Sequence, residues 1–309
     1  MIFAWLAAVV VGFPVAVLAS QRVVRHAKVM AAQSRIPKFV VGVSLLAVGT
    51  DLPEIANSII ASLADQGDIN VGDSLGSTAT QVTLVLGLMP FLGGAMMVKR
   101  GGGTVKTAWL TVAALALGAA LMSDGFIART DALILISAWL LGSIYLWRRV
   151  PQVRQLEFEL DGLPRSYHVV GTLVALLFVA GGAALAVAGI IGLAETLGIP
   201  GFLISFFGAS IGTSLPELIV DVSALKSGEP ELAVGDAVGS SFVDATLSIG
   251  SGPLIAPTAI TAGFAIQGAL LAMVAVAIVA LLFSRVRRHD RRTGALLIIV
   301  YAAFYLVLL

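Results

Sequence analysis

The sequence predicts an all-α polytopic membrane protein whose ten transmembrane helices form two inverted five-helix repeats. Three observations predict this fold: the composition, the placement of basic residues between apolar segments, and an internal repeat. Hydrophobic residues make up 58% of the 309 residues and charged residues 12%, with a mean hydropathy of +1.00. A soluble domain carries about 25% charged residues. Helices are the expected spans, because they satisfy their backbone hydrogen bonds internally.

Ten apolar segments are long enough to cross a hydrocarbon core about 30 Å thick. The first is not expected to be a cleaved signal peptide, because basic residues follow it and none precedes it. The ten predicted spans cover residues 2–20, 39–63, 72–98, 105–123, 131–148, 168–190, 199–225, 231–256, 260–284 and 294–309.

Lysine and arginine predict the orientation. If successive loops alternate sides, 18 of the 19 basic residues fall on one side and only Arg129 falls on the other. The basic side is cytoplasmic by the positive-inside rule. We therefore expect a multi-pass protein of the inner (plasma) membrane, with both termini outside the cytoplasm. Residues 1–150 form the first repeat, 151–167 a cytoplasmic linker, and 168–309 the second repeat.

The internal repeat aligns the segment that begins at Gly49 with the segment that begins at Gly212, without a gap. Gly-Thr-Asp-Leu-Pro-Glu at 49–54 returns as Gly-Thr-Ser-Leu-Pro-Glu at 212–217, and a Gly-Asp-x-x-Gly-Ser segment recurs further on. Across 49–77 and 212–240, 11 of 29 aligned positions are identical, mostly polar residues, glycine and proline. Five spans separate the two copies, so the second copy crosses the membrane in the opposite sense. Inverted repeats with interrupted helices are typical of secondary transporters.

Seven acidic residues lie inside the spans that carry the repeat, where no lysine or arginine lies at comparable depth. A carboxylate at the centre of a membrane helix costs about 2.5–3.5 kcal/mol on insertion scales. Without a cationic side chain it must be protonated, hydrated or neutralised by a bound cation, which indicates a cation transport site. The seven residues are Asp51, Glu54, Asp73, Glu217, Asp221, Asp236 and Asp244.

Some of these carboxylates have a structural interpretation as well. Asp221 lies near a span end, where polar residues are common. Asp73 and Asp236 follow glycines and could cap the start of a broken helix. Glu54 and Glu217 have no such role, since each is a mid-span glutamate that follows a proline.

The available ligand atoms are all oxygens, which suits Na⁺, Ca²⁺ and the related Mg²⁺ or Mn²⁺. There are no cysteines, and we expect the three histidines, His26, His168 and His289, to be solvated loop residues. No organic cofactor, nucleic-acid partner or obligate protein partner is expected; the partners are small cations and the lipid bilayer. Besides the carboxylates, the candidate ligands are the hydroxyls of Thr50, Ser77, Thr213, Ser214 and Ser240 and the amide of Gln81.

The two segments resemble the α-repeat signature of the sodium/calcium exchanger family, within the cation/Ca²⁺ exchangers. That signature is Gly-Thr-Ser-Leu-Pro-Glu followed by Gly-Asn-x-x-Gly-Ser-Asn, present twice in inverted orientation. The corresponding segments here are 49–81 and 212–244. The resemblance implies that ions bind Glu54 and Glu217, with Gln81, Asp244, the five hydroxyls above and the carbonyls of Ala47 and Ser210 contributing. It also implies exchange of extracellular Na⁺ for cytoplasmic Ca²⁺, with the first and sixth helices sliding across the core.

The chain departs from the family signature in its polar residues. Asp51 replaces a serine, Asp73 and Asp236 replace asparagines, and Gln81 is longer than the usual asparagine. The added acid could raise divalent affinity, bind a second ion, or carry protons if burial raises its pKa.

The leading functional hypothesis is a Na⁺-driven antiporter for Ca²⁺ or a related divalent cation. The alternative is a proton-coupled divalent cation antiporter, which the added aspartates favour. A passive cation channel is less well supported, because the motif occurs in only two inverted copies. An enzyme is not expected, because the chain shows no nucleophile–base pair and no cluster of histidine metal ligands.

Overall fold

A computed structural model describes residues 2–34, 38–98, 102–149, 162–196 and 214–308, and almost all of them are helical. The all-α prediction is therefore confirmed. Within these ranges, seven helices are long and apolar enough to cross a membrane, or eight if one pair bent by 45° counts as a single span. Of the other predicted spans, 199–225 lies partly outside the described residues, and the described part of 294–309 belongs to the last helix, Arg291–Leu308.

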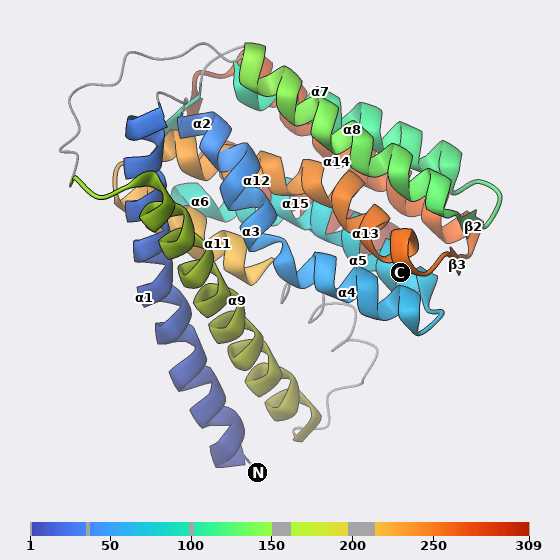
Figure 1. Ribbon diagram of the computed structural model, residues 1–309, viewed down its shortest axis with the longest axis horizontal. Helices are drawn as coiled ribbons and strands as arrows, with labels where there is room; N and C mark the ends of the chain where they lie inside the picture. Colours follow the sequence, from blue (N-terminus) through green and yellow to red (C-terminus); the bar gives the residue numbers. More distant parts are fainter. Residues whose placement is uncertain (1, 35–37, 99–101, 150–161, 197–213, 309) are drawn as a thin grey trace.

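The first half of the chain contains one long helix, two interrupted helices and two further long helices (Figure 1). In order, the elements are α1 (Ile2–Ser34), α2 (Lys38–Val41), the π-helical turn η1 (Gly42–Leu46), α3 (Ala47–Thr50), α4 (Leu52–Leu63), α5 (Gly67–Thr80), the π-helical turn η2 (Gln81–Val85), α6 (Leu86–Leu92), β1 (Met96–Met97), α7 (Gly103–Leu121), β2 (Phe126–Ile127) and α8 (Arg129–Arg149).

The second half repeats this order where it is described. Its elements are α9 (Arg165–Thr196), α11 (Leu215–Lys226), α12 (Pro230–Val243), the π-helical turn η3 (Asp244–Ser248), α13 (Ile249–Ile255), β3 (Thr258–Ala259), α14 (Ala262–Arg285), β4 (Arg288–His289) and α15 (Arg291–Leu308). Helices α11, α12 and α13 and turn η3 begin at the repeat equivalents of the first residues of α4, α5, α6 and η2, in the same register that aligns Gly49 with Gly212.

Two short antiparallel ribbons join the halves. Strand β1 pairs with β4, so that Met96 lies opposite His289, and β2 pairs with β3, so that Phe126 lies opposite Ala259. Strand β1 follows α6, and its partner β4 precedes α15, the last helix of the second half. Likewise β3 follows α13, and its partner β2 precedes α8, the last helix of the first half. The two ribbons are thus equivalent under the repeat.

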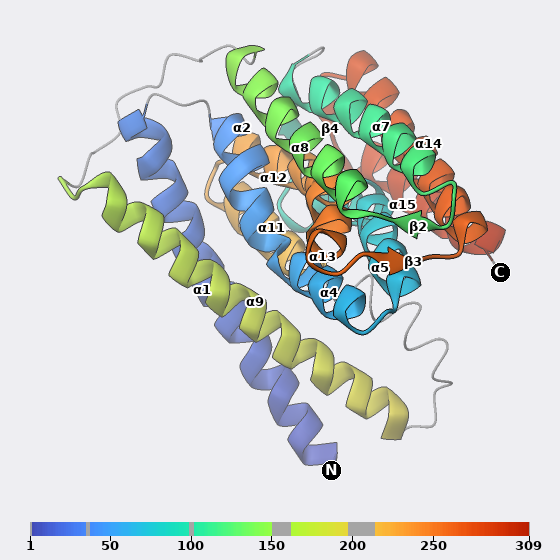
Figure 2. The ribbon, with the colours of Figure 1, turned by 45° about the vertical axis from the view of Figure 1, so that its right-hand side comes forward.

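Helices α1 and α9 pack against each other and project away from the remaining helices (Figures 1 and 2). Small residues bring them close: a Cβ on Gly182 would lie 2.7 Å from the carbonyl oxygen of Gly12. Such contacts are typical of membrane helix pairs, where dispersion rather than the hydrophobic effect drives association. The predicted spans 2–20 and 168–190 were too short, because both helices continue past the apolar segment into their charged flanks.

Helix α12 lies at the centre of the bundle, against α2, η1, α7 and α11. Its glycines allow direct backbone contact with the first half. A Cβ on Gly235 would lie 2.6 Å from the carbonyl oxygen of Phe39, and one on Gly42 would lie 2.6 Å from that of Leu232. This packing holds the polar face of α12 against the break between α3 and α4.

The prediction that all three histidines are solvated is wrong for two of them. His168 is 1% exposed, and its Nδ1 lies 3.1 Å from Nδ1 of His26, across the α1–α9 interface. His289 is fully buried, and its Nε2 lies 2.8 Å from the carbonyl oxygen of Leu86. Loop position alone did not reveal that each contacts another element.

Candidate cation site

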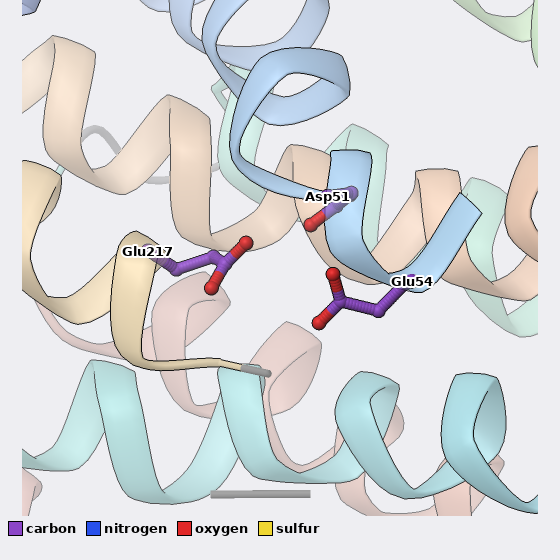
Figure 3. Close-up of side chains that lie close together, drawn as sticks. All are labelled: Asp51, Glu54 and Glu217. Carbon is purple, nitrogen blue, oxygen red and sulfur yellow. The ribbon is translucent and has the colours of Figure 1, made fainter. Parts of the chain in front are cut away.

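Three carboxylates converge at the centre of the molecule. Asp51, Glu54 and Glu217 are each 0% exposed, and each offers an oxygen within 4.8 Å of the others. Figure 3 shows Asp51 and Glu54 on one side of the gap and Glu217 reaching toward them from the other repeat. Three oxygen ligands at this separation form a candidate site for a hard cation.

Helix breaks place these side chains. Asp51 separates α3 from α4, and Ser214 immediately precedes α11; both have nearly the same backbone angles (φ −79°, ψ 8° and φ −81°, ψ 6°). Pro53 and Pro216 then occupy the first turn of each new helix, where a proline costs no hydrogen bond. Glu54 and Glu217 therefore lie in the first turn of a helix, whose dipole favours negative charge there.

Hydroxyl and amide groups surround the three carboxylates. Gln81 Nε2 donates to Asp51 Oδ1 at 3.3 Å, so two residues that depart from the family signature contact each other. Thr50 Oγ1 lies 3.4 Å from Asp236 Oδ1 and 3.3 Å from Ser240 Oγ, which joins the break in the first repeat to helix α12. Asp244 is fully buried, and neither of its carboxylate oxygens has a hydrogen-bond partner among the described residues.

Gln81 and Asp244 open the π-helical turns η2 and η3, respectively. A π-helical turn adds one residue to the helical turn and redirects the side chains that follow, and such turns are frequent at functional sites. Both residues are fully buried. The turns therefore point the two repeat-related side chains toward the carboxylates.

Of the 14 candidate ligands, 12 lie in the part of the chain that the structure describes, and 11 of these are buried. Asp73 is half-buried and lies beside Asn57; Ser210 and Thr213 lie outside the described residues. The 11 buried residues are Ala47, Thr50, Asp51, Glu54, Ser77, Gln81, Ser214, Glu217, Asp236, Ser240 and Asp244.

Asp73 and Asp236 do not cap helices. Helices α5 and α12 begin at Gly67 and Pro230, so both aspartates lie within continuous helix. The predicted span 72–98 began too late, because the polar start of α5 resembled a loop. Asp73 Oδ2 instead accepts a hydrogen bond from Asn57 Nδ2 at 2.7 Å.

Asp221 is fully buried on α11, beside Asp236 on α12, and does not lie at a solvated helix end. The sequence contained a signal for this position. Asp221 follows Glu217 by four residues, and residues four apart share a helix face.

Six fully buried carboxylates thus lie in one region of a bundle of membrane-spanning helices. The chain contains no lysine or arginine between residues 39 and 98 or between residues 227 and 284. The fold and the site together define a multi-pass membrane protein with a central candidate site for a cation. The six residues are Asp51, Glu54, Glu217, Asp221, Asp236 and Asp244.

The chain belongs to the sodium/calcium exchanger family, because residues 4–148 and 167–309 match the family described as sodium/calcium exchanger protein. By family it is a cation antiporter, since the members of this family are exchangers. It is 27% identical to inner membrane protein YrbG of Escherichia coli K12, over 94% of this chain and 92% of that protein. It is 25% identical to the sodium/calcium exchanger MaX1 of Methanosarcina acetivorans, over 92% and 93% of the two chains.

The fold matches that of a solved exchanger over the full length of both chains. The structure of the sodium-calcium exchanger NCX_Mj soaked with zero Na⁺ and Ca²⁺ superimposes with a TM-score of 0.82, at 23% sequence identity, and the match covers 100% of each chain.

Proposed function

We propose that this protein is a secondary active antiporter that exchanges Na⁺ for Ca²⁺, or for a related divalent cation, by alternating access. The observation that carries the proposal is the convergence of Asp51, Glu54 and Glu217, fully buried and within 4.8 Å of one another. A hard cation is the group that best stabilises three carboxylates removed from water.

Exclusive occupancy couples the two flows. The same oxygens can hold either one Ca²⁺ or several Na⁺, so loading one ion requires release of the other. Loading with either ion reduces the charge that must cross the membrane interior. Empty carboxylates would oppose the conformational change, and this opposition enforces exchange rather than leak.

Further oxygens are available to complete the coordination. The Ser214 hydroxyl has no hydrogen-bond partner among the described residues and precedes Glu217 by three positions. Thr50, Ser77 and Ser240 supply buried hydroxyls from α3, α5 and α12. Together with Gln81, Asp244 and the carbonyls of Ala47 and Ser210, these groups would offer the six to eight oxygens that Ca²⁺ takes.

In the proposed topology, ten spans form two inverted repeats, with both termini outside the cytoplasm. The recurrence of helix bounds in the register of the sequence repeat supports the two repeats. The segregation of 18 of 19 basic residues to one side supports the orientation and the count of ten. The name of the E. coli relative supports an inner-membrane location.

Uptake of radiolabelled Ca²⁺ into proteoliposomes tests this function. Vesicles loaded with Na⁺ are diluted into Na⁺-free buffer, alongside vesicles loaded with K⁺ and vesicles carrying only a pH gradient. We expect uptake to require internal Na⁺ and to be lost in both Glu54→Gln and Glu217→Gln. Asp124→Asn, in an exposed loop, is the matched control for loss of a carboxylate and should transport normally.

Two outcomes would overturn the proposal. Uptake driven by the pH gradient without Na⁺ would make the protein a proton-coupled divalent cation antiporter. No uptake under any gradient would mean that the altered motif residues select another cation.

A further inference from the structure

Asp221 is a buried carboxylate that the central site does not use. It lies on α11 one helical turn after Glu217 and is 0% exposed. Neither of its oxygens has a hydrogen-bond donor among the described residues. Helix α11 packs against α12, which carries Asp236, and the two carboxyl groups influence each other electrostatically.

Asp236 is also poorly supplied with donors. Its Oδ2 has no hydrogen-bond partner in the described part of the chain, and Oδ1 receives only the 3.4 Å contact from Thr50. Two carboxylates that face each other across α11 and α12 offer acceptors alone. If both carboxylates are ionised, a cation must lie close to them to balance their charge.

The other half of the molecule provides an internal comparison. The repeat equivalent of Asp236 is Asp73, and Asn57 Nδ2 donates to Asp73 Oδ2 at 2.7 Å. The equivalent of Asn57 is Val220, which has no donor, and the next residue is Asp221 itself. The second repeat therefore lacks the amide donor, and it carries a second acid at the next position, where the first repeat has Ser58.

We propose that Asp221 and Asp236 form a second site for a hard cation, beside the site of Asp51, Glu54 and Glu217. A bound ion would stabilise Asp236 as the Asn57 amide stabilises Asp73. This inference rests on the proposed function in one respect, that the buried carboxylates bind transported hard cations.

Charge balance supports a second ion. Six fully buried carboxylates lie in this region, and one Ca²⁺ neutralises only two negative charges. The Thr50 hydroxyl links the two sites, since it contacts Asp236 and its own residue adjoins Asp51. Oxygen ligands of this kind suit Na⁺ and Ca²⁺ alike, so each ion is tested separately.

The test is equilibrium binding of radiolabelled Ca²⁺, and in a separate arm radiolabelled Na⁺, to the purified full-length protein in detergent. In at least one arm, we expect Asp221→Asn and Asp236→Asn each to bind one ion fewer per chain than the unmodified protein. The double variant should lose no more than either single variant. Asp124→Asn, the control, should bind the full number.

Val220→Asn keeps both carboxylates and supplies the donor that Asn57 provides in the first repeat. We expect it to weaken the second ion about tenfold, the equivalent of one charge-assisted hydrogen bond, and to leave the first ion unchanged. This variant tests the site without deleting a carboxylate, and elution as a single gel-filtration peak establishes that each protein is folded.

The inference is wrong if Asp221→Asn and Val220→Asn both bind the full number of ions with unchanged affinity in both arms. That result would assign a proton rather than a metal ion to the Asp221–Asp236 pair. The proposed function is tested separately: it fails if the unmodified protein shows no Na⁺-dependent Ca²⁺ uptake, whatever its binding count.

Discussion

Asp51 distinguishes this site from the family signature, because a carboxylate occupies a position where the signature has serine. Its oxygen lies within 4.8 Å of oxygens of Glu54 and Glu217, so an ionised Asp51 would add a negative charge beside a bound ion. The Coulomb energy scales with ion charge, and the added carboxylate therefore favours a divalent over a monovalent ion. The Gln81 side-chain amide donates a hydrogen bond to Asp51, and this bond helps to accommodate the carboxylate in place of a serine.

We expect Asp51→Ser to weaken Ca²⁺ binding about tenfold or more. The reason is that the loss of one charge–charge contact in a buried site costs more than about 1 kcal/mol of binding free energy. Na⁺ binding should weaken less. Titration of bound radiolabelled Ca²⁺ with Na⁺ measures both affinities in one experiment. An unchanged Ca²⁺ affinity would show that Asp51 lies beside the ion without binding it.

His289 predicts how stability responds to pH. Burial lowers the pKa of His289 below its ordinary value of 6.5, and its Nε2–H donates to the Leu86 carbonyl. The neutral form is thus favoured in the folded state, so stability is present above pH 6.5 and is lost as pH falls through the lowered pKa. The Thr293 amide holds the pKa of Asp290 below its ordinary value, so that neighbour stays ionised in mildly acidic solution.

Thermal unfolding in detergent at a series of pH values checks this. Between about pH 7 and pH 5, which spans the unperturbed histidine pKa, the Tm of the unmodified protein should fall more than that of His289→Gln. Parallel curves for the two proteins would contradict the assignment.

At the scale of residues, the sequence alone allowed most of the site to be predicted, because a carboxylate in an apolar span has few stable interpretations. It could not show that Asn57 pairs with Asp73 and that Asp221 faces Asp236. Those contacts depend on the packing of one helix against another, and such packing leaves no periodic signal along the chain.

At the scale of elements, the contact of α12 with the first half depends on glycine. A Cβ on Gly235 would lie 2.6 Å from a backbone oxygen of Phe39, whereas nothing lies within 4 Å of a Cβ on Gly72, its repeat equivalent. Substitution of glycine by alanine should therefore affect the stability of the folded protein in opposite directions at the two positions.

We expect Gly235→Ala to destabilise the protein by about 1–3 kcal/mol through overpacking. Gly72→Ala should be neutral or stabilise slightly, because alanine has the higher helix propensity. Thermal unfolding of the two variants in detergent measures this difference. Equal stability of the two variants would show that the α12 contact is loose.

Helix ends and interruptions were harder to predict than helix existence. Pro53 lies just after the break between α3 and α4, and Pro216 lies in the first turn of α11. The π-helical turns were not predicted, because an i→i+5 bond replaces an i→i+4 bond without a distinctive residue. Helices α1 and α9 extend beyond their apolar segments, because charged residues are good helix formers once they leave the membrane.

At the scale of the whole molecule, α1 and α9 form a pair that projects from the remaining helices (Figure 2). A direct polar contact between described residues ties this pair to the core: Ser20 Oγ on α1 lies 2.6 Å from Ser223 Oγ on α11. If α1 and α9 slide across the core during exchange, this contact must break in each cycle.

A reversible cross-link tests that motion in a chain that has no native cysteine. The two serine oxygens lie 2.6 Å apart, compared with about 2.05 Å between the sulfur atoms of a disulfide. We expect oxidised Ser20→Cys/Ser223→Cys to stop Ca²⁺ uptake and reduction to restore it, with either single variant as the control. Full transport by the oxidised protein would exclude sliding of α1 against α11.

The two ribbons between the halves also belong to this scale. Each joins strands of two residues that lie far apart in the chain, Met96–Met97 with Arg288–His289 and Phe126–Ile127 with Thr258–Ala259. Such strands are too short for an alternating pattern, and their pairing depends on the approach of the two repeats. The repeat itself was visible because glycine, proline and acidic residues are rare in apolar spans.

In the proposed mechanism, one set of carboxylates holds either Na⁺ or Ca²⁺, and neither ion crosses the membrane alone. The most direct measurement is efflux of radiolabelled Na⁺ from proteoliposomes, with and without Ca²⁺ outside. We predict that Na⁺ leaves only when external Ca²⁺ is present, and that Glu217→Gln abolishes this efflux. Rapid Na⁺ efflux into a medium without Ca²⁺ would contradict the account, because it would identify a channel in which no counter-ion is required.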